Sequence, residues 1–158
     1  MKKIAVINDL SGFGKCSLTA AIPVISALGL ECCPMPTAVL SNQTGFESFY
    51  CDDFTDKMDF FTSEWKKLGV RFDGILTGFI ASHRQAEKIF RFLDEFQNDD
   101  TVFFCDPVMA DDGQIYDIYD KAMCDAVTRL AKRADIISPN LTELCVLTGE
   151  SYEVLSSS

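Results

Sequence analysis

Hydrophobic residues along the chain fall into short strand-like runs that alternate with longer segments of helical spacing. Four apolar runs have the length of buried strands: 3–7, 74–79, 102–105 and 135–137. A fifth extended segment, 31–39, contains Pro34 and Pro36, which predict an edge or irregular strand because proline cannot donate a ladder hydrogen bond. The pattern therefore predicts several short strands in one sheet.

The segments between these runs repeat hydrophobic residues at helical intervals. We predict helices over 17–28, 53–68, 85–96, 121–132 and a short stretch after Asn140. Gly29 and Gly69 follow the first two as helix-ending residues. Pro23 inside the first helix predicts a kink or a late start. Residues 41–45 form a polar loop, and 46–50 is predicted to be a short flap strand.

This alternation of strands and helices predicts an α/β fold with a doubly wound, mostly parallel sheet and flanking helices. No linker, internal repeat or change in composition divides the chain. We therefore expect residues 1–158 to form a single α/β domain.

Composition narrows the classes of partner. With 24 acidic and 14 basic residues, the net charge is −10, and no basic cluster suits nucleic acid or an anionic membrane. No apolar run approaches the roughly 18 residues that a membrane helix requires, and no signal peptide follows Met1. The seven cysteines include no C-x-x-C pair, which favours reduced thiols in a cytoplasmic protein.

Carboxylates follow two of the predicted strands. Asp106 comes after the run 102–105, and Glu143 comes shortly after 135–137. Ligands of open α/β sheets bind beyond the carboxyl ends of the strands, where acids suit a divalent cation and its nucleotide phosphates. Simpler explanations stay open: Asp106 and the nearby acids are a solvated turn, and Asn140 with Glu143 is a helix capping box.

The turn 11–17 resembles two phosphate-binding motifs without satisfying either. It lacks the spacing of a P-loop, and Ser17 occupies the position of the third glycine in the dinucleotide fingerprint. Its glycines still allow a ligand to approach the backbone, with Asp9 and Ser11 offering polar atoms. His83, the single histidine, is predicted to be a surface or capping residue.

Taken together, these segments resemble the pyridoxal/pyridoxamine kinase branch of the ribokinase-like small-molecule kinases. The resemblance runs from Lys3 to about Gly149 and covers the N-terminal portion of that family. It rests on five segments in family order: 9–14, 41–45, 76–79, 106–111 and 138–143.

The resemblance implies ATP-dependent phosphorylation of the 5′-hydroxymethyl group of a B6 vitamer, with Mg²⁺ as cofactor and a homodimer in the full-length family. It assigns the vitamer to Asp9, Ser11, Thr44, Gly45 and Phe79. It assigns the nucleotide to five further residues, of which Asp106 and Glu143 would also serve the metal: Asp106, Asp111, Ser138, Asn140 and Glu143.

The resemblance assigns no catalytic residue to this chain. The family's catalytic base, an Asp in a Gly-rich turn, has no counterpart in these residues, and the resemblance places it beyond Ser158. Because that base and its backbone donors stabilise the transition state, we expect little or no kinase activity from the chain alone.

The chain also departs from the family pattern within the matching segments. Asp9, Gln43 and Phe79 stand where family members often have serine, histidine and tyrosine, so the preferred vitamer is open. Alternatives to a kinase portion are a hydroxymethylpyrimidine kinase-like fragment, a non-catalytic vitamer- or nucleotide-binding module, and a non-functional fragment.

Overall fold

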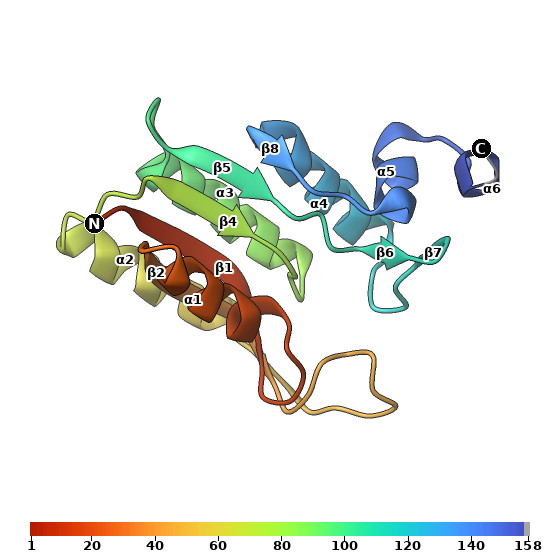
Figure 1. Ribbon diagram of the computed structural model, residues 1–158, viewed down its shortest axis with the longest axis horizontal. Helices are drawn as coiled ribbons and strands as arrows, with labels where there is room; N and C mark the ends of the chain where they lie inside the picture. The colour runs from red at the N-terminus through yellow and green to blue at the C-terminus, as the bar shows by residue number, and fades with distance from the viewer. Residues whose placement is uncertain (157–158) are drawn as a thin grey trace.

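A twisted six-stranded sheet forms the centre of the computed structural model, which describes residues 1–156 (Figure 1). The strand order is β3-β2-β1-β4-β5-β8, and all neighbours are parallel except the β2–β3 pair. The strands are β1 (Lys3–Ser11), β2 (Glu31–Leu40), β3 (Cys51–Asp53), β4 (Gly74–Thr77), β5 (Val102–Cys105) and β8 (Ile136–Ile137). A separate hairpin pairs β6 (Ala110–Asp111) with β7 (Gln114–Ile115).

Helices lie on both faces of the sheet, as a doubly wound fold requires (Figure 1). α1 (Ser17–Ala27) covers one face, while α2 (Met58–Lys67), α3 (His83–Phe96) and α4 (Lys121–Arg133) lie on the other. The 3-10 helix η1 (Thr55–Lys57) precedes α2, and α5 (Leu141–Thr148) and α6 (Tyr152–Ser156) follow β8. Within residues 1–156, no helix combines the length and apolar character that a membrane-spanning segment requires.

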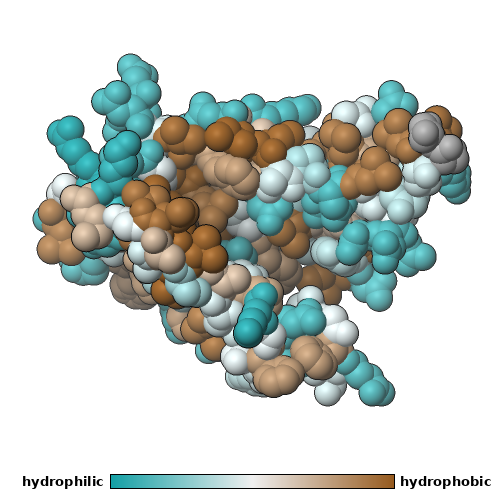
Figure 2. All heavy atoms as spheres, viewed as in Figure 1, coloured by the Kyte–Doolittle hydropathy of each residue, from teal (hydrophilic) through white to brown (hydrophobic). Residues whose placement is uncertain are grey.

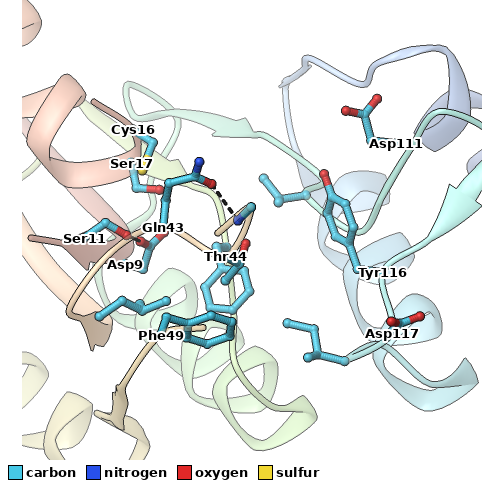
Figure 3. Close-up of a pocket in the computed structure, with 15 residues that line it drawn as sticks. Asp9, Ser11, Cys16, Ser17, Gln43, Thr44, Phe49, Asp111, Tyr116 and Asp117 are labelled. Atoms are coloured by element: carbon cyan, nitrogen blue, oxygen red, sulfur yellow. Dashed lines mark hydrogen bonds between the residues drawn. The ribbon is translucent and has the colours of Figure 1, made fainter. Parts of the chain in front are cut away.

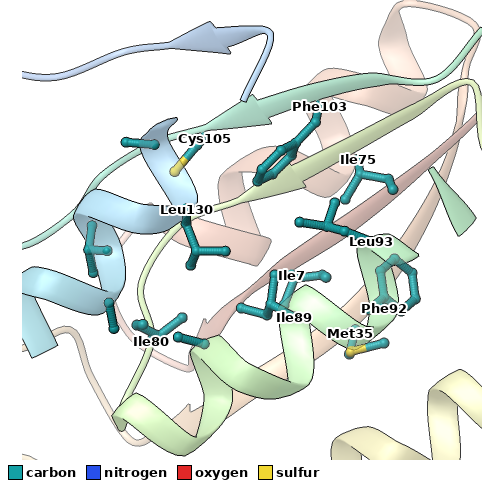
Figure 4. Packing of buried hydrophobic residues seen from close by; sticks show 14 of the residues in the cluster. Ile7, Met35, Ile75, Ile80, Ile89, Phe92, Leu93, Phe103, Cys105 and Leu130 are labelled. Atoms are coloured by element: carbon teal, nitrogen blue, oxygen red, sulfur yellow. The ribbon is translucent and has the colours of Figure 1, made fainter. Parts of the chain in front are cut away.

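The main hydrophobic core lies between the sheet and α3 and α4 (Figure 4). Ile7, Ile75 and Phe103 point into it from three adjacent strands, and Phe92 and Leu93 of α3 meet them there. All of these side chains are at most 1% exposed. Side chains alternate between the two faces along a strand. In β1, β4 and β5 the odd-numbered side chains therefore point toward α3, and the even-numbered ones point toward the face that carries α1.

The α1 face of the sheet is only partly covered. One row of side chains runs across it from Val6 through Leu76 and Phe104 to Ile136, as the strand registers show. Val6, beneath α1, is fully buried, whereas Ile136 is 48% exposed. Figure 2 shows hydrophobic residues gathered over this part of the molecule. We call Leu76, Val102, Phe104 and Ile136 the open face.

The predicted fold class is confirmed, and most elements lie where the pattern places them. The prolines of β2 do mark an edge, because β3 pairs only with Ala38–Leu40 and no described strand lies beside Pro34 and Pro36 on that side. α5 begins after Asn140, and its Gly149 has the left-handed φ of 77° that ends a helix. His83 is exposed at the start of α3, as predicted.

Several boundaries were wrong. β1 continues to Ser11 instead of ending at Ile7, because β2 pairs with it over that length. The predicted flap strand 46–50 is a loop, and the strand that follows it is β3. The helix predicted over 53–68 opens with η1, and α1 starts at Ser17 despite Pro23. The hairpin β6–β7 and helix α6 were not predicted, since their short segments carry no clear periodicity.

One expected boundary is not covered by the structure. The single domain was predicted to extend over 1–158, with the family's base Asp beyond Ser158. Ser158 itself lies outside the described residues, as does Ser157, so the structural description of that domain stops at Ser156. The extent of the domain and the place of the base therefore stay predictions.

Candidate functional site

A cavity of about 680 Å³ lies beyond the carboxyl ends of β1, β2 and β4 (Figure 3). This is the edge at which open α/β sheets bind their ligands. The five residues expected to hold a vitamer all line it: Asp9, Ser11, Thr44, Gly45 and Phe79. They come from separate segments of the chain, so the fold brings together residues that sequence order alone leaves apart.

Asp9 and Ser11 form a buried polar pair at the end of β1. The Ser11 hydroxyl donates to Oδ2 of Asp9 at 2.8 Å, and the two residues are 5% and 0% exposed. The register between β1 and β2 shifts here: Asn8 pairs with Pro36 and Leu10 with Val39, so two residues of β2 stand opposite Asp9. The extra residue makes a bulge in β2, and bulges are common beside functional sites. Asp9, opposite this bulge, lines the cavity.

The Gly-rich turn holds the polar loop in place. Gly12 and Phe13 donate backbone hydrogen bonds to Leu40 and Ser41, at 2.8 and 3.0 Å, so the two chain segments continue side by side beyond the sheet. Gly14 has a φ of 107°, and a Cβ there would lie 2.8 Å from the Gln43 side chain. The turn therefore needs glycine for its backbone geometry and for close approach, not for a P-loop.

Gln43 fixes the backbone of the loop next to it. Its Oε1 accepts a hydrogen bond from the Gly45 N–H at 2.8 Å, and its own backbone N–H donates to the Phe13 carbonyl at 3.0 Å. Thr44 lies between these anchored positions and faces the cavity (Figure 3). The polar loop is thus an ordered wall instead of a plain turn.

Asn8 positions both Asp9 and Phe79. Its Oδ1 accepts hydrogen bonds from the Phe79 N–H at 2.9 Å and the Asp9 N–H at 3.0 Å. A Cβ on Gly78 would lie only 2.4 Å from the Asn8 amide nitrogen, so Gly78 is required for this close approach. The sequence analysis did not identify Asn8. The signal that could have pointed to it is its position directly before Asp9 at the end of a predicted strand.

Gln85 is a second polar residue that sequence analysis missed. Fully buried on α3, it donates from Nε2 to the Thr37 carbonyl at 2.7 Å and to Thr55 Oγ1 at 2.9 Å. Its Oε1 accepts from the Ala81 N–H at 2.8 Å. The Thr37 hydroxyl in turn donates to the Phe79 carbonyl at 2.8 Å. Gln85 therefore stabilises Thr37 of β2, and through Thr37 it helps to hold Phe79 in the cavity wall.

The opposite wall comes from the segment around the β6–β7 hairpin. Asp111, Tyr116 and Asp117 line the cavity across from Asp9 and Ser11 (Figure 3). Tyr119 stabilises this wall, because its hydroxyl donates to the Ile80 carbonyl at 2.9 Å. Asp111 was expected on the nucleotide side, but it lines the same cavity as the predicted vitamer residues.

Asp106 and Ser138 meet at the ends of β5 and β8. The Ser138 hydroxyl donates to Asp106 Oδ1 at 3.2 Å. Desolvation raises the pKa of Asp106 above its ordinary value, and the hydrogen bond from Ser138 opposes that shift. The carboxylate is half-buried and accepts one side-chain hydrogen bond, so its oxygens can still accept further hydrogen bonds or bind a cation.

Glu143 completes a capping box at the start of α5. Its Oε2 accepts from the Asn140 N–H at 2.9 Å, and Asn140 Oδ1 accepts from the Glu143 N–H at 2.9 Å. Glu143 Oε1 also accepts from the Met109 N–H at 3.2 Å. Burial raises the pKa of Glu143, and the backbone donors oppose the shift. The capping explanation is thus confirmed for this acid.

Asn140 joins this cluster to the cavity wall. Its Nδ2 donates to the Ala110 carbonyl at 2.8 Å, next to Asp111. Four of the five residues expected on the nucleotide side therefore lie together at one edge of the sheet: Asp106, Ser138, Asn140 and Glu143. The fifth, Asp111, lines the cavity. Among residues 1–156, no three acidic, cysteine or histidine side chains are placed to hold a metal by themselves.

Comparison with known proteins points to one family. A model of the family described as phosphomethylpyrimidine kinase matches residues 14–157. A Bacteroides thetaiotaomicron structure assigned as a phosphomethylpyrimidine kinase, determined with pyridoxal, is 44% identical with a TM-score of 0.93, over 99% of this chain and 57% of that one. Pyridoxal kinase from Lactobacillus plantarum is 30% identical with a TM-score of 0.89, over 98% and 55%.

A curated relative agrees with these structures. Pyridoxal kinase PdxY of Aliivibrio fischeri is 26% identical over 98% of this chain and 56% of its own length. The chain thus spans slightly more than half the length of the relatives that it matches, and both kinase names occur among them.

Proposed function

Because the chain belongs to the phosphomethylpyrimidine kinase family, whose model matches residues 14–157, we propose that its cavity binds a B6 vitamer for phosphorylation. The group that receives the phosphoryl is the 5′-hydroxymethyl, and ATP is the donor. One observation carries the proposal: all five residues expected to hold the vitamer line a single cavity. Phe79 supplies a ring wall, and Asp9 and Thr44 supply polar atoms at the ends of β1 and β2.

The cluster at β5 and β8 is the proposed Mg-ATP side. Mg²⁺ usually takes one or two protein carboxylates and completes its shell with water and phosphate oxygens. Asp106 fits this role, because it is half-buried and receives a hydrogen bond from Ser138 on one oxygen. Glu143 fits less directly, because both its oxygens already accept backbone hydrogen bonds. When bound, the metal would neutralise phosphate charge.

We propose that the 158-residue chain binds its vitamer but transfers phosphate slowly or not at all. Phosphoryl transfer depends on positioning and on charge stabilisation around the moving group. The family's Gly-rich turn with its base Asp has no match among these residues. The full-length reaction would also take place in the cytoplasm, with reduced cysteines and a dimeric enzyme.

A second candidate function is phosphorylation of a hydroxymethylpyrimidine. The description of the matching family favours it, as does the assignment of the Bacteroides relative. Both substrates are flat heteroaromatic rings with a hydroxymethyl group, so the same cavity suits either. A binding comparison separates the two candidates.

Calorimetry on the purified chain tests the proposal. We expect pyridoxine to bind more tightly than hydroxymethylpyrimidine, and Phe79→Ala to weaken pyridoxine binding by about tenfold, because it removes the aromatic wall. Phe60→Ala is the matched control, since Phe60 is 69% exposed on α2 and does not line the cavity. Its affinity should equal that of the unmodified chain.

Three outcomes would contradict parts of the proposal. Absence of binding to both pyridoxine and pyridoxamine rejects the vitamer assignment, and tighter binding of hydroxymethylpyrimidine than of either vitamer favours the second candidate. Rapid production of phosphorylated vitamer by the chain with Mg-ATP would show that the missing Gly-rich turn is not needed.

A further inference from the structure

The described residues that line the cavity include acids but no basic side chain. Asp9, Asp111 and Asp117 line it, and the described lining includes no lysine, arginine or histidine. Asp9 lies on one wall and Asp111 and Asp117 on the other, so the acids surround the space instead of pairing with each other (Figure 3). A ligand in this space meets a field that favours positive charge.

Asp9 is the most buried of these acids. It is 5% exposed, and the ion pairs within residues 1–156 do not include it. Its side chain accepts a hydrogen bond from the neutral Ser11 hydroxyl. Burying a carboxylate without an opposite charge is unfavourable. A cationic group on the ligand would remove that cost.

The protein also holds Asp9 in a defined position. Its place within the paired part of β1, the hydrogen bond from the Asp9 N–H to Asn8, and the hydrogen bond from Ser11 restrain its backbone and side chain. A restrained carboxylate loses little conformational freedom when a ligand binds. Little of its attraction for a cation is therefore offset by lost entropy, and the affinity is higher.

We infer that Asp9 is a specificity-determining residue that selects a substrate with a cationic amine. This inference rests on the proposed function and names the substrate class of that site: a pyridine ring with an aminomethyl group, in preference to one with a neutral group there. An alkylamine of this kind is protonated at neutral pH, as a lysine side chain is. It donates a charge-assisted hydrogen bond to the carboxylate.

Pyridoxamine and pyridoxine test the inference, because an aminomethyl group in one replaces a hydroxymethyl group in the other. Both groups donate hydrogen bonds, and only the first is charged. Calorimetry on the 158-residue chain at pH 7 should show pyridoxamine binding about 10- to 100-fold more tightly, the range that one charge-assisted hydrogen bond supports. Asp9→Asn keeps an acceptor for Ser11 and should reduce the preference to about threefold or less.

Asp99→Asn is the matched control, since Asp99 is exposed and lies outside the cavity while its loss changes net charge equally. It should retain the preference. Circular dichroism checks folding, and Asp9→Ser is the second variant if Asp9→Asn does not fold. Equal binding of both vitamers by the unmodified chain overturns the inference and leaves the proposed function intact. Binding of neither overturns both, and retention of the preference in Asp9→Asn overturns the role of Asp9.

Discussion

At the scale of single residues, the two acids that follow β5 and β8 serve different purposes. Glu143 directs both oxygens to backbone N–H groups and fixes the start of α5. Asp106 receives a side-chain hydrogen bond from Ser138 and is held in a partly desolvated position. An ionised group in such a position lowers stability, while it suits a site that binds cations.

Asp106→Asn should therefore raise the unfolding midpoint at pH 7. Because the folded state holds the Asp106 proton more tightly than the unfolded state, stability is greatest below the ordinary pKa of 3.8 and falls as pH rises through the raised pKa. The variant lacks this loss, so the two proteins should converge near pH 3. Thermal melts across pH, with Asp99→Asn as an exposed control, measure the effect. A lower midpoint for Asp106→Asn at pH 7 would contradict it.

At the scale of elements, one buried amide connects four parts of the fold. Gln85 on α3 contacts the Thr37 carbonyl on β2, Asp53 at the end of β3, Thr55 in η1 and the Ala81 N–H before α3. These segments carry the bulge and the Phe79 wall, so the cavity depends on a residue that does not line it.

Gln85→Leu should destabilise the protein by about 3 kcal/mol, since it leaves buried backbone groups without partners. Gln97→Leu, at the other end of the same helix, should change stability by no more than about 0.5 kcal/mol, as is usual for partly exposed positions. Urea unfolding followed by circular dichroism compares the two variants. A loss for Gln85→Leu as small as that of Gln97→Leu would contradict the expected stabilising role of the hydrogen bonds made by Gln85.

At the scale of the whole molecule, the sheet is covered unevenly. α2, α3 and α4 bury one face, whereas α1 covers only part of the other (Figure 1). Val102 and Ile136 on the open face are 47% and 48% exposed. β8 contributes two residues and pairs with β5 alone among the described strands. Apolar patches and free strand edges of this kind promote association.

We expect the 158-residue chain to associate with itself as its concentration rises. A double variant, Val102→Thr with Ile136→Thr, keeps β-branched residues in the strands but makes the open face more polar. It should move the sedimentation coefficient toward that of a monomer. Val24→Thr, which replaces a 58% exposed residue of α1 outside the open face, is the control. Monomeric behaviour of the unmodified chain at high concentration would contradict this expectation.

The sequence by itself determined the fold class, the position of most strands and helices, and five residues that prove to line one cavity. These features follow from local periodicity and from residues at strand ends, which depend on near neighbours. The tertiary structure alone decided the bulge in β2 opposite Asp9, the place of Asp111 in the opposite wall and the role of Gln85. Gln85 bonds to a residue 48 positions away, and such a contact exists only after β2 and α3 have packed together.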